Sequence, residues 1–391
     1  MKNKVLILGK GHIGYRLKRQ LCADNFDVFT SSADVLMAGH EEESVVESVN
    51  SYVQSLNPES LSMIYLLDDK DETNLQLIII LISLYPDVPI TASLFNENLI
   101  PHLLVQGKNL SVINPAKLAA PHFVKALYHE VERREVVTVP QHKTPITPPY
   151  KISLIEKLLI LFAIILCNAV LFFHFEEHLP WMDAIYFVIV TAATVGYGDI
   201  SMIHSDVSTK IAVILLIFSS TVLVWMIFSL TIDAFLKRRI QLSLGRKKYH
   251  LKNHIVVCGL GRLGFFVVEE LLRNNERVII IETNEQARHL DYFRHLGAEV
   301  YIGDGRQTKV LDDVNIAEAK ALISVINNDS MNLEIGLNAR TFQPDLRLIL
   351  RIFEEKMAEK IKNILNIHLS ISASVIVEGK LFQILKEKQQ G

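Results

Sequence analysis

Two long apolar segments constrain the fold of this 391-residue chain more than any other feature. Residues 158–175 contain no Asp, Glu, Lys or Arg, and residues 211–235 carry one formal charge, Asp233. Helices over these ranges would be roughly 27–37 Å long, enough to cross a hydrocarbon core of about 30 Å. The sequence therefore predicts two membrane-spanning helices, with a buried core helix as the less favoured alternative for each.

The rest of the chain has the composition of soluble domains. Overall it is 50% apolar and 21% charged, with a mean hydropathy of +0.26, which is too polar for a protein built wholly of spans. In residues 1–135 and 253–391, short apolar runs alternate with helical stretches, as in α/β domains. Dense prolines predict a linker at 136–151. We expect the membrane domain at 152–240 and a basic linker at 241–252.

The distribution of charge predicts how the chain is oriented. Residues 237–252 hold seven Lys or Arg and no acid, whereas residues 176–210 hold five acids and one Lys. Because basic flanks stay in the cytoplasm, we expect a multi-pass protein of the cell membrane with both termini cytoplasmic. The net charge of −3 argues against a nucleic-acid partner.

The two soluble regions are copies of one pattern. Gly9, Gly11 and Gly14 match Gly259, Gly261 and Gly264 at an offset of 250 residues. Further downstream the offset is 258 residues, and the matched pairs there are Asn74 with Asn332, Phe95 with Phe353, and Glu97 with Glu355. A constant offset with one eight-residue gap predicts a duplicated domain, with the gap between about residues 15 and 73.

The second copy has the spacing of a dinucleotide-binding loop. Gly259, Gly261 and Gly264 lie between a predicted strand and helix, and Glu282 ends the next predicted strand. Glycines at this spacing let a pyrophosphate approach the helix N-terminus, and the Glu282 carboxylate accepts hydrogen bonds from ribose hydroxyls. Since Glu282 would repel a 2′-phosphate, NAD(H) or an adenine nucleotide is favoured over NADP. A lobe that kept its packing glycines and lost its ligand is the alternative.

The first copy is a weaker candidate for a nucleotide site. It keeps Gly9, Gly11 and Gly14, but its second strand is expected to end in serines, with Asp34 as the nearest acid. A scaffold role is therefore favoured for this copy, and nucleotide binding is the alternative.

Between the two apolar segments lies a hexapeptide whose residues are Thr194, Val195, Gly196, Tyr197, Gly198 and Asp199. Alternating glycines allow a backbone that aims successive carbonyl oxygens at one axis, where they replace the water around a dehydrated cation. Residues 180–191, which begin at a proline, are predicted to form a re-entrant pore helix. One such strand cannot enclose an ion, so four chains are expected to meet as a homotetramer.

This hexapeptide is identified by its likeness to the selectivity filter of potassium channels. Over nearly its whole length the chain resembles the two-transmembrane, ligand-gated potassium channels that bear regulator-of-potassium-conductance domains. The resemblance implies that backbone carbonyls of Thr194, Val195, Gly196 and Tyr197 hold K⁺. It also implies that Arg262 and Asp304 join the glycines and Glu282 in binding a nucleotide.

The expected fold is therefore a membrane α-helical pore hairpin, with two transmembrane helices and a re-entrant pore helix, flanked by two α/β Rossmann-like domains. The expected function is passive, potassium-selective conduction, gated by cytosolic domains that bind NAD(H) or another adenine nucleotide. The protein is not expected to be an enzyme. The alternatives are a membrane-tethered NAD-dependent oxidoreductase and a regulatory component of a potassium uptake system.

Overall fold

The computed structural model describes residues 3–36, 42–128, 153–353 and 369–390. It divides into two compact units. One unit contains both soluble lobes, in residues 1–142 and 244–391, and the other contains the apolar helices, in residues 143–243.

The second lobe is a six-stranded parallel sheet in the order β11-β10-β9-β6-β7-β8. Its strands are β6 (Ile255–Cys258), β7 (Val278–Glu282), β8 (Glu299–Ile302), β9 (Ala321–Ser324), β10 (Arg347–Arg351) and β11 (Leu369–Ile371). Its helices are α10 (Arg262–Arg273), α11 (Leu290–His295), α12 (Thr308–Asp313) and α13 (Asp329–Arg340), with a short 3₁₀ turn, η2 (Ile316–Glu318). The central strands β6 and β9 are buried along their whole length, as expected of a parallel sheet covered on both faces.

The first lobe repeats this plan with five parallel strands in the order β2-β1-β3-β4-β5. Its strands are β1 (Lys4–Leu8), β2 (Asp27–Ser31), β3 (Leu61–Leu66), β4 (Ile90–Ser93) and β5 (Leu110–Ile113). Its helices are α1 (His12–Ala23), α2 (Ala33–Leu36), α3 (Glu42–Ser55), α4 (Asp71–Leu84) and α5 (Ile100–Gln106), with η1 (Pro58–Ser60) before β3.

The two lobes differ where the sequence predicts the gap. After β7 the second lobe adds the edge strand β8, whereas the described residues after β2 form the helices α2 and α3. The half-exposed strand β2 is accordingly the edge of the first sheet. Among its described residues, the first lobe has no counterpart of β8, the strand that Gly303 and Asp304 follow in the second lobe.

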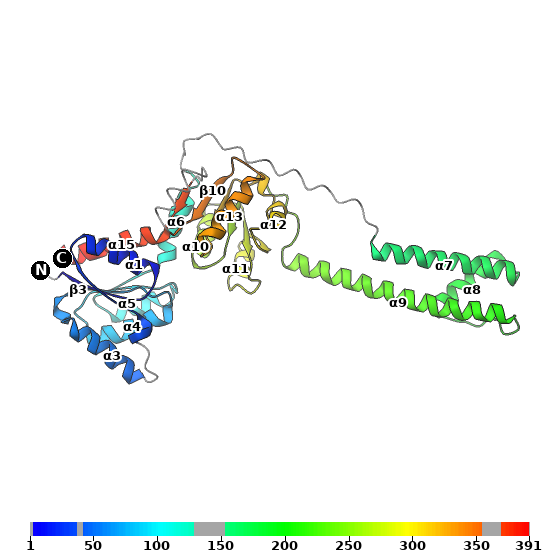
Figure 1. Ribbon diagram of the computed structural model, residues 1–391, viewed down its shortest axis with the longest axis horizontal. Coiled ribbons are helices and arrows are strands. Elements are labelled where there is room, and N and C mark those ends of the chain that lie inside the picture. Colours follow the sequence, from blue (N-terminus) through cyan, green and yellow to red (C-terminus); the bar gives the residue numbers. More distant parts are fainter. Residues whose placement is uncertain (1–2, 37–41, 129–152, 354–368, 391) are drawn as a thin grey trace. The chain divides into compact units, whose positions relative to one another are not determined.

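The helix that ends each lobe packs against the other lobe. Helix α6 (Pro115–Lys125) follows β5 but lies along α10, and α15 (Ala373–Gln390) follows β11 but lies along α1 (Figure 1). Phe123 of α6 is fully buried in the core of the second lobe. Leu381 of α15 is fully buried in the first, and its carbonyl accepts a 3.0 Å hydrogen bond from the Tyr65 hydroxyl. Each lobe therefore depends on the other's last helix to complete its core.

The second unit is a hairpin of two long helices with a short one between them. These are α7 (Leu154–Glu176), α8 (Trp181–Ala192) and α9 (Val207–Ser243). Both long helices are apolar and long enough to cross a membrane, and large side chains such as Phe218 and Trp225 are about two-thirds exposed (69% and 66%). Core helices of a soluble protein bury such side chains, so the exposure favours a lipid surrounding.

Residue chemistry explains the ends of these helices. Ser153 and Glu156 form a capping box at the start of α7, where the Ser153 hydroxyl accepts from the Glu156 amide at 3.2 Å. The predicted re-entrant helix corresponds to α8, which has Pro180 as its N-cap. Asp233 pairs with Lys237 at 2.8 Å, one turn along α9.

Candidate functional sites: a filter strand and a nucleotide cavity

The backbone after α8 alternates between left-handed and ordinary conformations. Thr194, Gly196 and Gly198 have φ angles of +57°, +58° and +81°, whereas Val195 and Tyr197 between them have negative φ. This alternation is what the glycine spacing predicts for a strand that turns successive carbonyl oxygens toward one side. A β-branched residue such as Thr194 is rare at positive φ, and strain of this kind clusters at functional sites.

Polar and aromatic contacts join α7 to residues on either side of this strand. The Glu177 carboxylate accepts from the Ser205 hydroxyl at 2.8 Å and from the Thr209 hydroxyl at 2.5 Å, which ties the end of α7 to the start of α9. The His174 ring stacks on Trp181, with ring centroids 3.8 Å apart. These contacts connect α7 with both ends of the segment that carries α8 and the filter strand.

The second lobe forms the predicted glycine loop between β6 and α10. Gly259 has a φ of +93°, and a Cβ atom on Gly264 would lie 2.0 Å from the Gly259 carbonyl oxygen. A Cβ atom on Gly261, by contrast, would meet no atom within 4 Å. Gly259 and Gly264 are therefore required by backbone angle and packing, and Gly261 leaves open space in front of α10.

Two carboxylates stand beside this loop. Glu282, at the end of β7, accepts from the backbone amides of Leu260 at 2.7 Å and Thr283 at 2.8 Å. Asp304, after β8, accepts from the Arg306 guanidinium at 2.7 and 3.1 Å. That hydrogen bond holds the pKa of Asp304 below its ordinary value, so the carboxylate is ionised at neutral pH.

The glycine loop after β6 and the carboxylates of Glu282 and Asp304 line one cavity of about 700 Å³. The cavity lies at the carboxyl ends of β6 and β9, where the strand order of the second sheet reverses. Such switch points are the usual ligand sites of open α/β sheets. The structure brings together at this cavity five of the six predicted second-lobe residues: Gly259, Gly261, Arg262, Glu282 and Asp304. Gly264 packs underneath the loop instead.

The first lobe's glycine loop is closed. A Cβ atom on Gly9 would lie 2.5 Å from the Asp68 amide nitrogen, and one on Gly11 would lie 2.8 Å from the Leu67 carbonyl oxygen. The Asp69 carboxylate also lies 3.1 Å from that Gly11 position. The connection after β3 thus fills the space that stays open beside Gly261, and Gly9, Gly11 and Gly14 do not line the cavity.

First-lobe residues that sequence reasoning missed do line it, among them His12, Asp69, Lys70 and Phe95. The Arg262 guanidinium lies 3.9 Å from the Phe95 ring centroid and donates to the Asp69 carbonyl at 2.6 Å. The reciprocal pair, His12 and Phe353, has ring centroids 4.0 Å apart. In each lobe, the residue after the second glycine of the loop therefore contacts the repeated phenylalanine of the other lobe. The occurrence of this phenylalanine in both copies was the sequence signal that could have predicted these contacts.

The repeated asparagines have a structural role. Asn332 donates to the carbonyls of Ile326 at 2.8 Å and Arg351 at 2.9 Å, joining the loop after β9 to β10. Asn74 makes the corresponding bonds to Asp68 at 2.8 Å and Ser93 at 2.9 Å. Both side chains are fully buried, so each amide shapes the carboxyl edge of its sheet.

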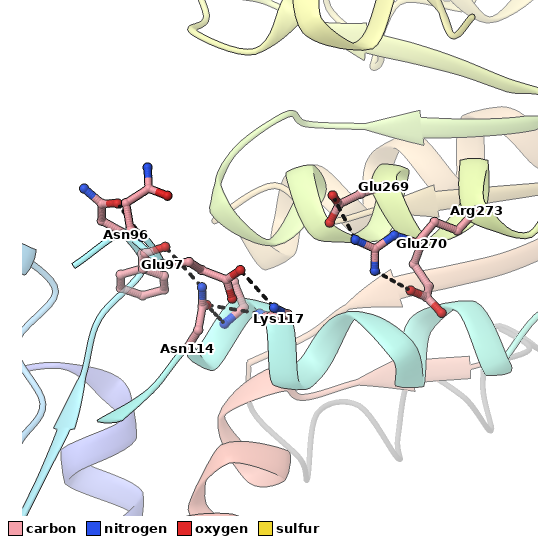
Figure 2. Close-up of polar contacts among 10 residues, drawn as sticks. Asn96, Glu97, Asn114, Lys117, Glu269, Glu270 and Arg273 are labelled. Atoms are coloured by element: carbon pink, nitrogen blue, oxygen red, sulfur yellow. Dashed lines mark hydrogen bonds and ion pairs between the residues drawn. The ribbon is translucent and has the colours of Figure 1, made fainter. Parts of the chain in front are cut away.

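A hydrogen bond joins the start of α6 to the backbone of Phe95. Asn114 caps α6 by accepting from the Lys117 amide at 3.1 Å, and its side-chain amide donates to the Phe95 carbonyl at 3.1 Å. Lys117 also pairs with Glu97 at 2.9 Å (Figure 2). The exchanged helix is thus coupled directly to the residue on which Arg262 stacks.

Two family matches cover the candidate sites. Residues 159–237 match the family described as "Ion channel", and residues 255–373 match the TrkA-N domain. The predicted fold class is confirmed, with two apolar helices and Rossmann-like parallel sheets. The predicted resemblance to potassium channels with regulator-of-potassium-conductance domains is confirmed as well.

Curated relatives match about half of the chain. "Probable potassium channel protein 2" of Methanocaldococcus jannaschii is 28% identical over 192 residues, which is 48% of this chain and 55% of that protein. "Potassium channel protein 1" of the same organism is 29% identical over 191 residues, covering 47% and 56%. The chain therefore spans about half the length of these relatives.

The fold has a counterpart among solved structures. The "Crystal Structure of the GsuK RCK domain" matches with a TM-score of 0.57 and 15% identity, covering all of this chain and 78% of that one. At this identity the likeness concerns the fold alone.

Proposed function

We propose that this chain, which joins an ion-channel region to a TrkA-N domain, forms a potassium-selective channel gated by a nucleotide. One observation carries the proposal: between two membrane-length helices lies a strand, Thr194–Gly198, with left-handed backbone at every second residue. Its carbonyl oxygens from Thr194 to Tyr197 would replace the hydration shell of K⁺. Conduction is passive, since a filter strand supplies binding sites and no source of energy.

The filter requires four chains. A single strand offers oxygens on one side of the ion only, so a homotetramer is needed for a ring of ligands. In the single chain Val195 is 50% exposed and Tyr197 71% exposed, which fits side chains that neighbouring subunits cover.

The cavity of the second lobe supports a regulatory nucleotide. Glu282 and Asp304 supply carboxylate oxygens as acceptors for ribose hydroxyls, and the open space at Gly261 admits a pyrophosphate at the α10 N-terminus. We assign the cavity to NAD(H) or an adenine nucleotide, because Glu282 disfavours a 2′-phosphate. The curated relatives are named as channels, so the nucleotide is proposed as a regulator and not as a redox cosubstrate.

The experiment that tests this function measures K⁺ and Na⁺ flux in liposomes that contain the purified chain. We expect K⁺ flux well above that of empty vesicles, little Na⁺ flux, and a change on adding NADH, NAD⁺ or ATP. The detergent-solubilised particle should have four times the 44.3 kDa chain mass. Vesicles that conduct no K⁺ under any addition, or a stable dimer, would contradict the proposal.

The basic segment after α9 supports a cytoplasmic location for both soluble lobes. A cysteine introduced at Ser205 should react with an impermeant maleimide from outside the cell, whereas one introduced at Tyr292 should react only after permeabilisation. The opposite pattern would reverse the proposed orientation.

A further inference from the structure

The cavity beside the glycine loop is shared between the two lobes. On the second-lobe side it is lined by Gly259, Gly261 and Glu282. On the first-lobe side it is lined by residues of the connection after β3, Asp69 and Lys70. A ligand bound at the glycine loop therefore shares its cavity with the carboxyl edge of the degenerate lobe.

The charged side chains that line this cavity differ in whether they have a partner of opposite charge or a hydrogen-bond partner. Glu282 is held by backbone amides, and Asp304 by Arg306. Arg351 lines the cavity and is attracted electrostatically by Asp329 and Asp69. The exposed Lys70 ammonium has no ion pair among the residues that the structure describes. Arg262 has no ion pair among these residues either, but its guanidinium is already held by the Phe95 ring and the Asp69 carbonyl. Among the described residues of the lining, the Lys70 ammonium of the first lobe is therefore the cation left to meet an anionic ligand.

We propose that Lys70 binds the distal phosphate of a nucleoside polyphosphate whose ribose and first phosphate are held by the second lobe. This inference rests on the proposed nucleotide site and specifies its ligand class. An ammonium is a strong donor to phosphate oxygens, and it contacts only a ligand long enough to reach it. The ligand then bridges two lobes of one chain, and the first copy is an essential wall of the site.

The closed glycine loop of the first lobe sets the stoichiometry. The carbonyl of Leu67 and the carboxylate of Asp69 occupy the position that a phosphate would need beside Gly11. A carboxylate there repels phosphate as well as filling the space. Each chain therefore binds one nucleotide, and a tetramer binds four.

Calorimetric titration of the full-length protein in detergent with AMP, ADP, ATP and NADH tests both statements. We expect about one nucleotide per chain, and a roughly tenfold weaker affinity of Lys70→Gln for ADP and ATP, equivalent to about 1.4 kcal/mol. AMP affinity should change less than about twofold, and Lys70→Arg should restore most of the loss. Lys108→Gln, at an exposed position of the same lobe outside the cavity, is the matched control and should bind as the wild type does.

Each other outcome overturns part of the account. Unchanged ADP and ATP affinity in Lys70→Gln, an equal loss for AMP, or two nucleotides per chain would overturn the bridged site while leaving a nucleotide site in place. Failure of the wild type to bind any of the four nucleotides would overturn the nucleotide regulation as well. Potassium flux, measured separately, would still test the pore.

Discussion

At the scale of single residues, the filter strand depends on backbone angles that most side chains avoid. Gly196 sits at a φ of +58°, where no neighbouring atom within 4 Å would block a Cβ atom. The constraint on this position is therefore conformational and does not come from packing. A left-handed conformation costs an L-residue about 1–2 kcal/mol.

We predict that Gly196→Ala reduces potassium selectivity. The added Cβ atom favours a return to negative φ, which would turn one ring of four carbonyls away from the axis. The measurement is the K⁺/Na⁺ flux ratio in liposomes, which should fall by at least about tenfold. Gly379→Ala, where a Cβ atom also meets nothing within 4 Å but φ is not positive, should leave the ratio unchanged. Equal ratios in the two variants would refute the conformational argument.

A second residue-scale prediction concerns the pair of Asp304 and Arg306. The Arg306 hydrogen bond lowers the pKa of Asp304 in the folded protein, so the pair stabilises the fold above the unfolded pKa of about 3.9. This contribution is lost as the pH falls through the lower folded pKa. We therefore expect Arg306→Gln to lower Tm at pH 7, with the difference from the wild type shrinking below about pH 4. Thermal unfolding across pH 3–8 measures it, and a constant difference would contradict the assignment.

At the scale of elements, the exchanged helices make the two lobes interdependent. Helix α6 presents small residues, Ala116, Ala119 and Ala120, that allow close approach to α10, and Phe123 fills the core beyond them. These residues belong to the first copy in sequence but to the core of the second lobe in space. A destabilising substitution in α6 should therefore destabilise the second lobe, whose residues lie more than a hundred positions later in the sequence.

We predict that Phe123→Ala destabilises the second lobe by about 3–5 kcal/mol, because it opens a cavity in a buried core. Hydrogen exchange should show faster exchange in β6 and α10 than in the wild type, and nucleotide affinity should fall. Val105→Ala, at a residue 88% exposed, should change stability by less than about 0.5 kcal/mol. Faster exchange confined to the first lobe would mean that α6 supports only its own copy.

At the scale of the whole molecule, the segment between α9 and the second lobe joins the apolar helices to the lobe that carries the proposed nucleotide site. This segment, residues 244–252, is bound along the edge strand β8. The Leu244 carbonyl accepts from the Ile302 amide at 2.8 Å, and Arg246 donates to the Ile302 carbonyl at 2.8 Å. Gly245 has a φ of +68°, and a Cβ atom there would lie 1.7 Å from the Val300 carbonyl oxygen.

We predict that inserting Gly-Ser-Gly-Ser after Gly245 uncouples nucleotide binding from conduction. The insertion lengthens the only covalent path from α9 to the second lobe while leaving the filter and the cavity intact. Nucleotide should then bind with wild-type affinity but change K⁺ flux little, and the K⁺/Na⁺ ratio should stay the same. The same insertion after Lys108 is the control. A full nucleotide response after insertion at Gly245 would show that the signal takes another route.

Much of this architecture could be predicted because its signals are local or repeated. Long uncharged segments indicate the spans, and the Thr194–Gly198 pattern indicates the filter. The fingerprint that ends at Glu282 indicates the nucleotide loop. Each signal depends on backbone geometry or on hydrophobic periodicity within a short stretch of sequence. The domain boundaries themselves, and the residues assigned to K⁺ and nucleotide, remain predictions.

The sequence by itself determined the two apolar helices, the duplicated α/β pattern, and the glycine spacing of the Thr194–Gly198 strand and of the loop before α10, because these properties depend on neighbours along the chain. Only the tertiary structure decided that the lobes exchange α6 and α15, that Gly11 is closed while Gly261 is open, and that Lys70 lines the cavity of the other copy. These facts depend on contacts between residues that are far apart in the sequence. The free energy of such contacts is set by how the elements pack, and no local sequence pattern encodes it.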